Sequence, residues 1–213
     1  MPQHSKPRSL KRPRATKRPK CKLYVFSEGK NSEPEYLKSF RRIHSNNLVD
    51  IKIVEAAGVP LTIVRKAKAK VQELKKAAKK SGDSLDLEFK VWAVFDRDAH
   101  PNINAAFDEA HTAGVCIAYS NPCFEIWPYL HLVNHSAPIH RHDLQRNLNK
   151  VLPCYNPSRA KTVKADDIDK HYDTAKARAQ RLANSHASVG TPMASPYTDF
   201  FELTDLIKKN GKQ

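Results

Sequence analysis

Short apolar segments alternate with helical patterns over the first 120 residues, and this alternation restricts the fold more than any other feature of the sequence. The apolar segments have the length and composition of buried strands. They lie at residues 23–26, 50–56, 90–96 and 115–120. Helical patterns follow the first three of them, at residues 32–43, 60–83 and 103–113. Strands that alternate with helices predict an α/β fold with a mostly parallel sheet and flanking helices.

The helices show both capping signals and amphipathic faces. Ser32, followed three residues later by Glu35, is predicted as an N-cap, and Thr198 is predicted to cap a last helix with Asp199 in its first turn. In the helix over residues 60–83 the inward stripe is Leu61, Val64, Ala67, Val71, Leu74 and Ala78.

After residue 120 the pattern becomes mostly helical. Residues 121–133, NPCFEIWPYLHLV, form the most apolar segment and are expected to pack on the sheet, with Phe124 and Trp127 in the core. Residues 166–184 carry one stripe of apolar residues at helical spacing. We therefore predict a basic arm over residues 1–20, an α/β core over 21–120 and a helical C-terminal extension over 121–213 that packs on the core. The stripe consists of Ile168, Tyr172, Ala175, Ala179 and Leu182.

The charge balance favours a polyanionic partner. The chain has 37 Lys and Arg against 22 Asp and Glu, a formal net charge of +15, which is typical of proteins that bind nucleic acid. Residues 1–20 contain eight basic residues, four prolines and no acid, so the arm is predicted to be disordered and either binds phosphates or aids solubility. No apolar run is long enough to span a membrane, and four scattered cysteines favour a reducing, cytoplasmic setting.

Three acidic residues follow two of the predicted strands. Glu28 follows the first strand, and Asp96 and Asp98 follow the third. Ligands collect at the carboxyl ends of parallel strands, so these acids converge if the two strands are neighbours. Carboxylates that lie close together repel unless a cation joins them, and Mg²⁺ or Mn²⁺ prefers oxygen ligands. The alternative is that each acid caps a helix or is solvated.

Basic residues near these acids and on the helix over 60–83 are candidates for binding nucleic-acid phosphates. Lys66, Lys70, Lys76 and Lys80 are predicted to face solvent, and Lys68 and Lys75 to flank the inward stripe. The alternative is an ordinary solvated surface. The candidates are Lys30, Arg65, Lys66, Lys70, Lys76 and Arg97.

Two other classes of site are poorly supported. SEGKNS lacks the earlier glycine of a phosphate-binding P-loop. His131 and His135 share a helical face, but no glutamate follows His131 as a zinc-protease motif requires. These histidines are expected to be surface groups or phosphate contacts.

The motifs VFSEGKNSEPEYLKSF, VWAVFDRDAH, SNPCFEIWPYLH and SPYTDFFEL together resemble the RloB-like family, which is associated with phage abortive infection and restriction loci. The resemblance implies a Toprim-like core, Glu28 as the acid/base, and Asp96 and Asp98 as Mg²⁺ ligands. It also implies a partner ATPase. Asn121, Glu125 and His131 are secondary site candidates. The segment CYNPSRAK departs from the Tyr-x-Lys-like patch of such proteins, so the resemblance assigns no role to its lysine.

We therefore predict a nuclease that uses Mg²⁺ or Mn²⁺ to cleave DNA or RNA in antiphage defence. The alternative is a non-catalytic subunit that binds nucleic acid or regulates an ATPase-containing defence complex. Sequence patterns alone favour neither DNA nor RNA.

Overall fold

Five strands form one sheet in the order β2-β1-β3-β4-β5. The chain, known from a computed structural model, is described over residues 21–45, 48–56, 58–82, 84–97, 100, 102–159 and 161–211. The first four strands are parallel, and β5 pairs antiparallel with β4. The predicted α/β fold with a mostly parallel sheet is confirmed. The strands are β1 (Cys21–Ser27), β2 (Val49–Glu55), β3 (Phe89–Asp96), β4 (Cys116–Asn121) and β5 (Tyr197–Thr198).

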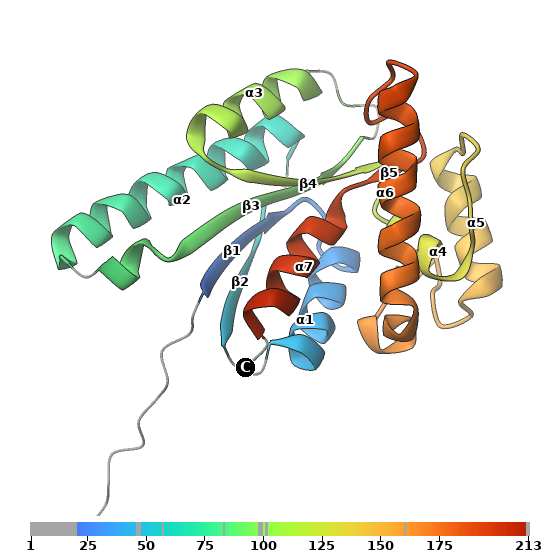
Figure 1. Cartoon of the computed structure of the whole chain (residues 1–213), viewed down its shortest axis with the longest axis horizontal. Coiled ribbons are helices and arrows are strands. Elements are labelled where there is room, and N and C mark those ends of the chain that lie inside the picture. Colours follow the sequence, from blue (N-terminus) through green and yellow to red (C-terminus); the bar gives the residue numbers. More distant parts are fainter. Residues whose placement is uncertain are drawn as a thin grey trace, which may run out of the picture.

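Helices cover both faces of the sheet (Figure 1). On one face lie α2 (Pro60–Ser81) and α3 (Ile103–Ala113), and on the other lie α1 (Ser32–His44) and α7 (Phe200–Gly211). The helices α4 (Ile126–Leu132), α5 (Arg141–Val151) and α6 (Tyr172–Ser188) stand together beyond α1, at the right of Figure 1. Short 3₁₀ helices span Ser84–Leu87, Ala165–Asp167 and Asp169–His171.

Alternate side chains of β1 enter two separate hydrophobic cores, as expected for a strand covered on both faces. Leu23 and Val25 join the core under α1, α4, α6 and α7, whereas Tyr24 and Phe26 join the core under α2 and α3. Side chains of the C-terminal helices therefore pack against the sheet in the first core, as expected of the apolar segment 121–133.

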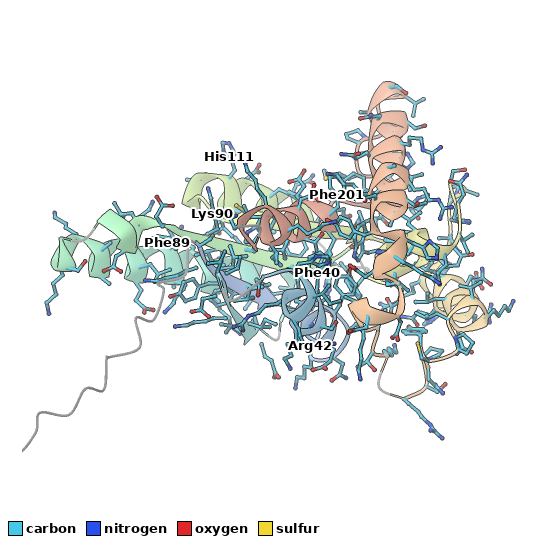
Figure 2. All side chains as sticks on the ribbon, turned by 60° about the horizontal axis from the view of Figure 1, so that its bottom comes forward. Phe40, Arg42, Phe89, Lys90, His111 and Phe201 are labelled. Atoms are coloured by element: carbon cyan, nitrogen blue, oxygen red, sulfur yellow. The ribbon has the colours of Figure 1, made fainter. Side chains whose placement is uncertain are left out.

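Aromatic side chains fill the first core. Phe124 and Trp127 are fully or almost fully buried, which confirms their predicted core positions. The rings of Phe124 and Phe200 pack edge to face with their centroids 5.1 Å apart, a favourable geometry for aromatic pairs. Phe40 of α1 points into this core, whereas Arg42 lies on the outer side of the same helix, where it pairs with Asp166 (Figure 2).

The long helix α2 follows its predicted boundaries closely. Pro60 occupies its first turn, where a missing N–H costs nothing, and Gly82 ends it in the left-handed conformation with φ of 68°. Most of the predicted inward stripe is buried, with Leu61 and Leu74 half-buried and Ile63 added to it. Among the described residues, no helix is both long and apolar enough to cross a membrane.

Both predicted helix caps differ from the structure. Asn31, not Ser32, is the N-cap of α1, because the Ser32 hydroxyl instead donates to the carbonyl oxygen of Lys161 at 2.5 Å. Thr198 belongs to β5, and α7 begins at Phe200, so Asp199 precedes the helix. The Thr198 hydroxyl still accepts a hydrogen bond from the Phe200 N–H at 3.2 Å.

Candidate active site at the carboxyl edge of the sheet

A cavity of about 180 Å³ lies where β1 and β3 end. We call it the acidic pocket because four carboxylates line it: Glu28, Glu33, Asp96 and Glu125. Glu28 follows β1, Asp96 ends β3, Glu33 lies in the first turn of α1, and Glu125 precedes α4. Because β1 and β3 are parallel neighbours, their carboxyl ends meet, and Glu28 and Asp96 converge as the strand pattern predicts.

The Glu28 side chain has one partnered oxygen and one unpartnered oxygen. Its Oε1 lies 3.1 Å from Nε2 of His100, and its backbone N–H donates to the carbonyl oxygen of Val94 at 3.1 Å. Its Oε2 is buried, and no described residue forms a hydrogen bond with it. Buried carboxylate oxygens nearly always have a partner, so this oxygen can accept a further contact, such as one from a cation, inside the pocket.

Glu33 is 4% exposed and holds a strongly perturbed carboxyl. Burial raises the pKa of Glu33 to about 7; the negative charges of Glu125 and Glu28 add to the rise, against hydrogen bonds from the backbone amides of Glu33 and Gly29. The carboxyl lies against Gly29 so closely that a Cβ there would be 2.1 Å from Glu33 Oε2. A side chain at position 29 would therefore displace Glu33 from the pocket.

Glu125 is also 4% exposed and is held by two hydrogen bonds. The Tyr155 hydroxyl donates to Glu125 Oε1 at 2.7 Å, and Gln145 Nε2 donates to the same oxygen at 3.2 Å. Burial, followed by the charge of Glu125, raises the pKa of Tyr155, so this phenol stays a donor. The orientation of Glu125 is thus set by α5 and by the loop that follows α5.

Two cations border the same pocket. Arg141 is the first residue of α5, and Lys161 lies in the segment between α5 and α6. The Ser32 hydroxyl ties this segment to α1. The resemblance assigned no role to Lys161, and the structure places it at the acidic pocket. Cations beside a carboxylate pocket are suited to binding the phosphates of a substrate.

The carboxylates suit a hard divalent cation such as Mg²⁺ or Mn²⁺, since such ions take oxygen ligands and relieve repulsion between like charges. The unpartnered Oε2 of Glu28 fits such an ion. Within the described part of the chain, no three His, Cys, Asp or Glu side chains are grouped closely enough to hold a metal. Asp98, the third predicted ligand, lies outside the described residues.

A second cavity, of about 330 Å³, adjoins the first, because Arg141 lines both. We call it the basic pocket; its lining includes the cations Arg97 and Arg141 together with His140. Asn121, a secondary candidate, also lines it. Of the predicted phosphate contacts, Arg97 therefore lies beside the acids, and Lys30 is exposed in the loop between β1 and α1.

The predicted phosphate contacts on α2 lie on the opposite face of the sheet from α1 and are partly neutralised. Arg65 and Lys68 both pair with Glu109 of α3, at 3.4 and 3.0 Å. Lys70 is half-buried rather than solvent-facing, because it pairs with Glu73 and lies over the ring of Tyr24 at 5.1 Å.

The remaining lysines of α2 follow the prediction more closely. Lys66, Lys76 and Lys80 are exposed, as predicted, and Lys75 is exposed too instead of flanking the stripe. With a rise of about 1.5 Å per residue, Lys76 lies about 24 Å along the axis from Pro60, the start of the helix. A phosphate track on α2 would therefore lead away from the carboxyl edge of the sheet.

His131 is not a surface group. It is 2% exposed, its Nδ1 lies 2.9 Å from the Trp127 carbonyl oxygen, and its ring meets the Trp127 ring edge to face at 4.7 Å. Burial lowers the pKa of His131 to about 4, so the ring is neutral at physiological pH. The expectation of a surface or phosphate-binding histidine is wrong, because the apolar face of α4 carries this ring into the core.

Sequence patterns missed Glu33 and His100, and they gave Glu125 only as a secondary candidate. Glu125 carried a signal, since it is the one charged residue in the apolar segment 121–133. The positions of Glu33 and His100 depend on how α1 and the chain after β3 approach β1, which periodicity does not encode.

Comparison with protein-family models matches residues 23–207 to the family described as RloB-like protein. This region includes every described residue of the acidic and basic pockets named above. No curated protein and no solved structure matches the chain.

Proposed function

Because the chain belongs to the RloB-like protein family, we propose that it is a nuclease that cleaves phosphodiester bonds with Mg²⁺ or Mn²⁺ and acts in antiphage defence. The observation that carries the proposal is Glu28 Oε2, which is buried in the acidic pocket with no hydrogen-bond partner among the described residues. A cation would supply that partner and would offset the repulsion among the surrounding carboxylates. The net charge of +15 suits a polyanionic substrate.

Glu28 and Asp96 would hold the cation, with Asp98 as the further ligand that the resemblance implies. Such an ion, when bound, activates a water and stabilises negative charge on the scissile phosphate. Around it, His100 fixes one oxygen of Glu28, and the Tyr155 hydroxyl orients Glu125.

The other residues of the pocket would handle protons and substrate phosphates. Burial raises the pKa of Glu33 in the metal-free protein, so this carboxyl can keep a proton until a cation enters the pocket and favours its release. Arg141 and Lys161 would attract the phosphates of the substrate.

The test is to replace the two strand-end acids by their amides and to compare cleavage with binding. Glu28→Gln and Asp96→Asn should abolish cleavage of single- and double-stranded DNA and RNA in Mg²⁺ or Mn²⁺, while nucleic-acid affinity stays within about twofold, since no phosphate contact is removed. Asp108→Asn, at an exposed acid of α3, is the matched control and should cleave normally. Undiminished cleavage by Glu28→Gln would refute the proposal.

A second candidate function follows from the absence, within the described residues, of three side chains grouped for metal binding. In that case the chain would bind nucleic acid or regulate a partner ATPase without catalysing a reaction. The two functions are separated by assaying the wild-type protein alone and with the ATPase that the family resemblance implies. Nucleic-acid binding without cleavage in both assays would favour the regulatory function, provided that Glu28→Gln binds nucleic acid as tightly as wild type.

A further inference from the structure

The basic pocket differs from the acidic pocket in both charge and shape. Its volume is about 330 Å³, which lies within the usual range for small-molecule sites. Its lining combines the cations Arg97 and Arg141 with His140 and with two apolar residues, Pro122 and Ile139. No carboxylate is among the described residues that line it. This chemistry suits an anion that also carries a flat apolar body.

Hydrogen bonds connect the basic pocket to the acidic pocket. Arg97 directly follows Asp96, and its Nη1 donates to the carbonyl oxygen of His100 at 3.3 Å. The ring of the same His100 holds Glu28 Oε1 at 3.1 Å. His100 therefore orients a group of each pocket, and Arg141 lines both. A ligand that filled the basic pocket would place its neighbouring atoms beside the carboxylates.

We propose that the basic pocket binds one unpaired nucleotide of a nucleic-acid strand, next to the phosphodiester bond at the acidic pocket. Arginine is suited to this task because its planar guanidinium binds a phosphate through two hydrogen bonds and stacks on a base. Pro122 and Ile139 would cover the apolar faces of the base and sugar. A base inside a duplex has both faces covered by its stacked neighbours, so only an unpaired nucleotide can lay its base against Pro122 and Ile139. The substrate is therefore single-stranded, or unpaired, at this position.

The inference rests on the proposed nuclease function only for the statement that the nucleotide flanks a bond to be cleaved; binding is tested separately. The experiment measures affinity in EDTA for a ten-nucleotide single strand and for a duplex of the same length and sequence, by fluorescence anisotropy. Ile139→Trp fills the cavity without changing its charge, and Arg97→Ala removes one phosphate contact. Arg146→Ala is the matched control, because it removes the same charge from an exposed position on α5.

Wild type should bind the single strand more tightly than the duplex. Arg97→Ala should weaken single-strand binding about tenfold or more, as the loss of a charge-assisted hydrogen bond predicts. Ile139→Trp should weaken single-strand binding by a similar factor and abolish the preference for the single strand over the duplex. Arg146→Ala should change it by about twofold or less, as for a rim charge. Thermal unfolding of each variant shows whether the fold is intact, and Arg97→Ala decides the test if Ile139→Trp does not fold.

Equal affinity for single strand and duplex, or folded Arg97→Ala and Ile139→Trp proteins that bind like wild type, would overturn the nucleotide site. The nuclease proposal would survive that result if Glu28→Gln still lost cleavage. Conversely, loss of single-strand binding in Ile139→Trp together with full cleavage by Glu28→Gln would support the nucleotide site and refute the nuclease.

Discussion

Replacing Glu33 with glutamine should stabilise the protein at neutral and alkaline pH and leave its stability unchanged in acid. The folded-state pKa of Glu33 is about 7, against an ordinary value of 4.5. Below pH 4.5 the carboxyl is protonated in both states. Between pH 4.5 and 7 the unfolded chain releases the proton while the folded protein keeps it, so the free energy of unfolding falls as pH rises. Above pH 7 the folded protein holds a buried charge.

The size of the effect follows from that difference of roughly 2.5 pKa units. Each unit corresponds to 1.36 kcal/mol, so wild type should lose about 3 kcal/mol of stability between pH 4 and pH 8.5 through this group alone. Glutamine has nearly the same shape as the protonated carboxyl and does not titrate. It therefore removes the loss without opening a cavity.

The assay is urea unfolding of wild type and Glu33→Gln in EDTA at several pH values from 4 to 8.5. The variant should match wild type near pH 4 and exceed it by about 3 kcal/mol at pH 8.5. Asp199, whose pKa is also raised to about 7 by burial, is present in both proteins and cancels from the difference. A difference that stays constant over this pH range would show that Glu33 is not the titrating group and would refute the reasoning.

Three further predictions concern the metal, the loop after β1 and helix α2. Mg²⁺ or Mn²⁺ should raise the Tm of wild type but not of Glu28→Gln, because a ligand stabilises only the state that binds it. At pH 4, where Glu33 is protonated, Gly29→Ala should lower the free energy of unfolding by about 1–3 kcal/mol through overpacking, and adding Glu33→Ala should recover part of that loss in a double-mutant cycle; additive losses would contradict the contact. Replacing Lys66 and Lys76 with Glu should weaken nucleic-acid binding equally for all base sequences. It should also reduce the slope of log affinity against log salt by about 0.9 for each lost contact with a duplex phosphate. An unchanged slope would show that α2 is an ordinary solvated surface.

The fold was predictable from the sequence because its signals are local. The strand at residues 90–96 and the helix at 60–83 are periodic patterns that need no knowledge of distant residues. The convergence of Glu28 and Asp96 required only the rule that ligands gather where parallel strands end. Placing β1 beside β3 was an assumption, and the register between them supports it.

The rest of the site could not be predicted because long-range contacts set it. Glu33 is buried because α1 packs close to Gly29. The Ser32 hydroxyl does not cap the helix but donates a hydrogen bond to the carbonyl oxygen of Lys161, 129 positions away. Lys70 looked exposed on a helical wheel, but Tyr24 of β1 lies within reach beneath it. The polar ring of His131 is buried in the core, where it also contacts the ring of Tyr172 on α6. For Ser32 and Lys70, partners far away in the sequence, Lys161 and Tyr24, override the local preference.

The order in which the chain is made gives β5 and α7 a further consequence. β5 pairs with the last two residues of β4, and α7 packs against α1, β2 and β4, with Phe200, Leu203 and Ile207 fully buried. A ribosome releases these residues after all four parallel strands, so a nascent chain that ends before residue 197 lacks the strand partner of Ser120 and Asn121 and leaves the core side chains beneath α7 uncovered. Such an intermediate would depend on chaperones.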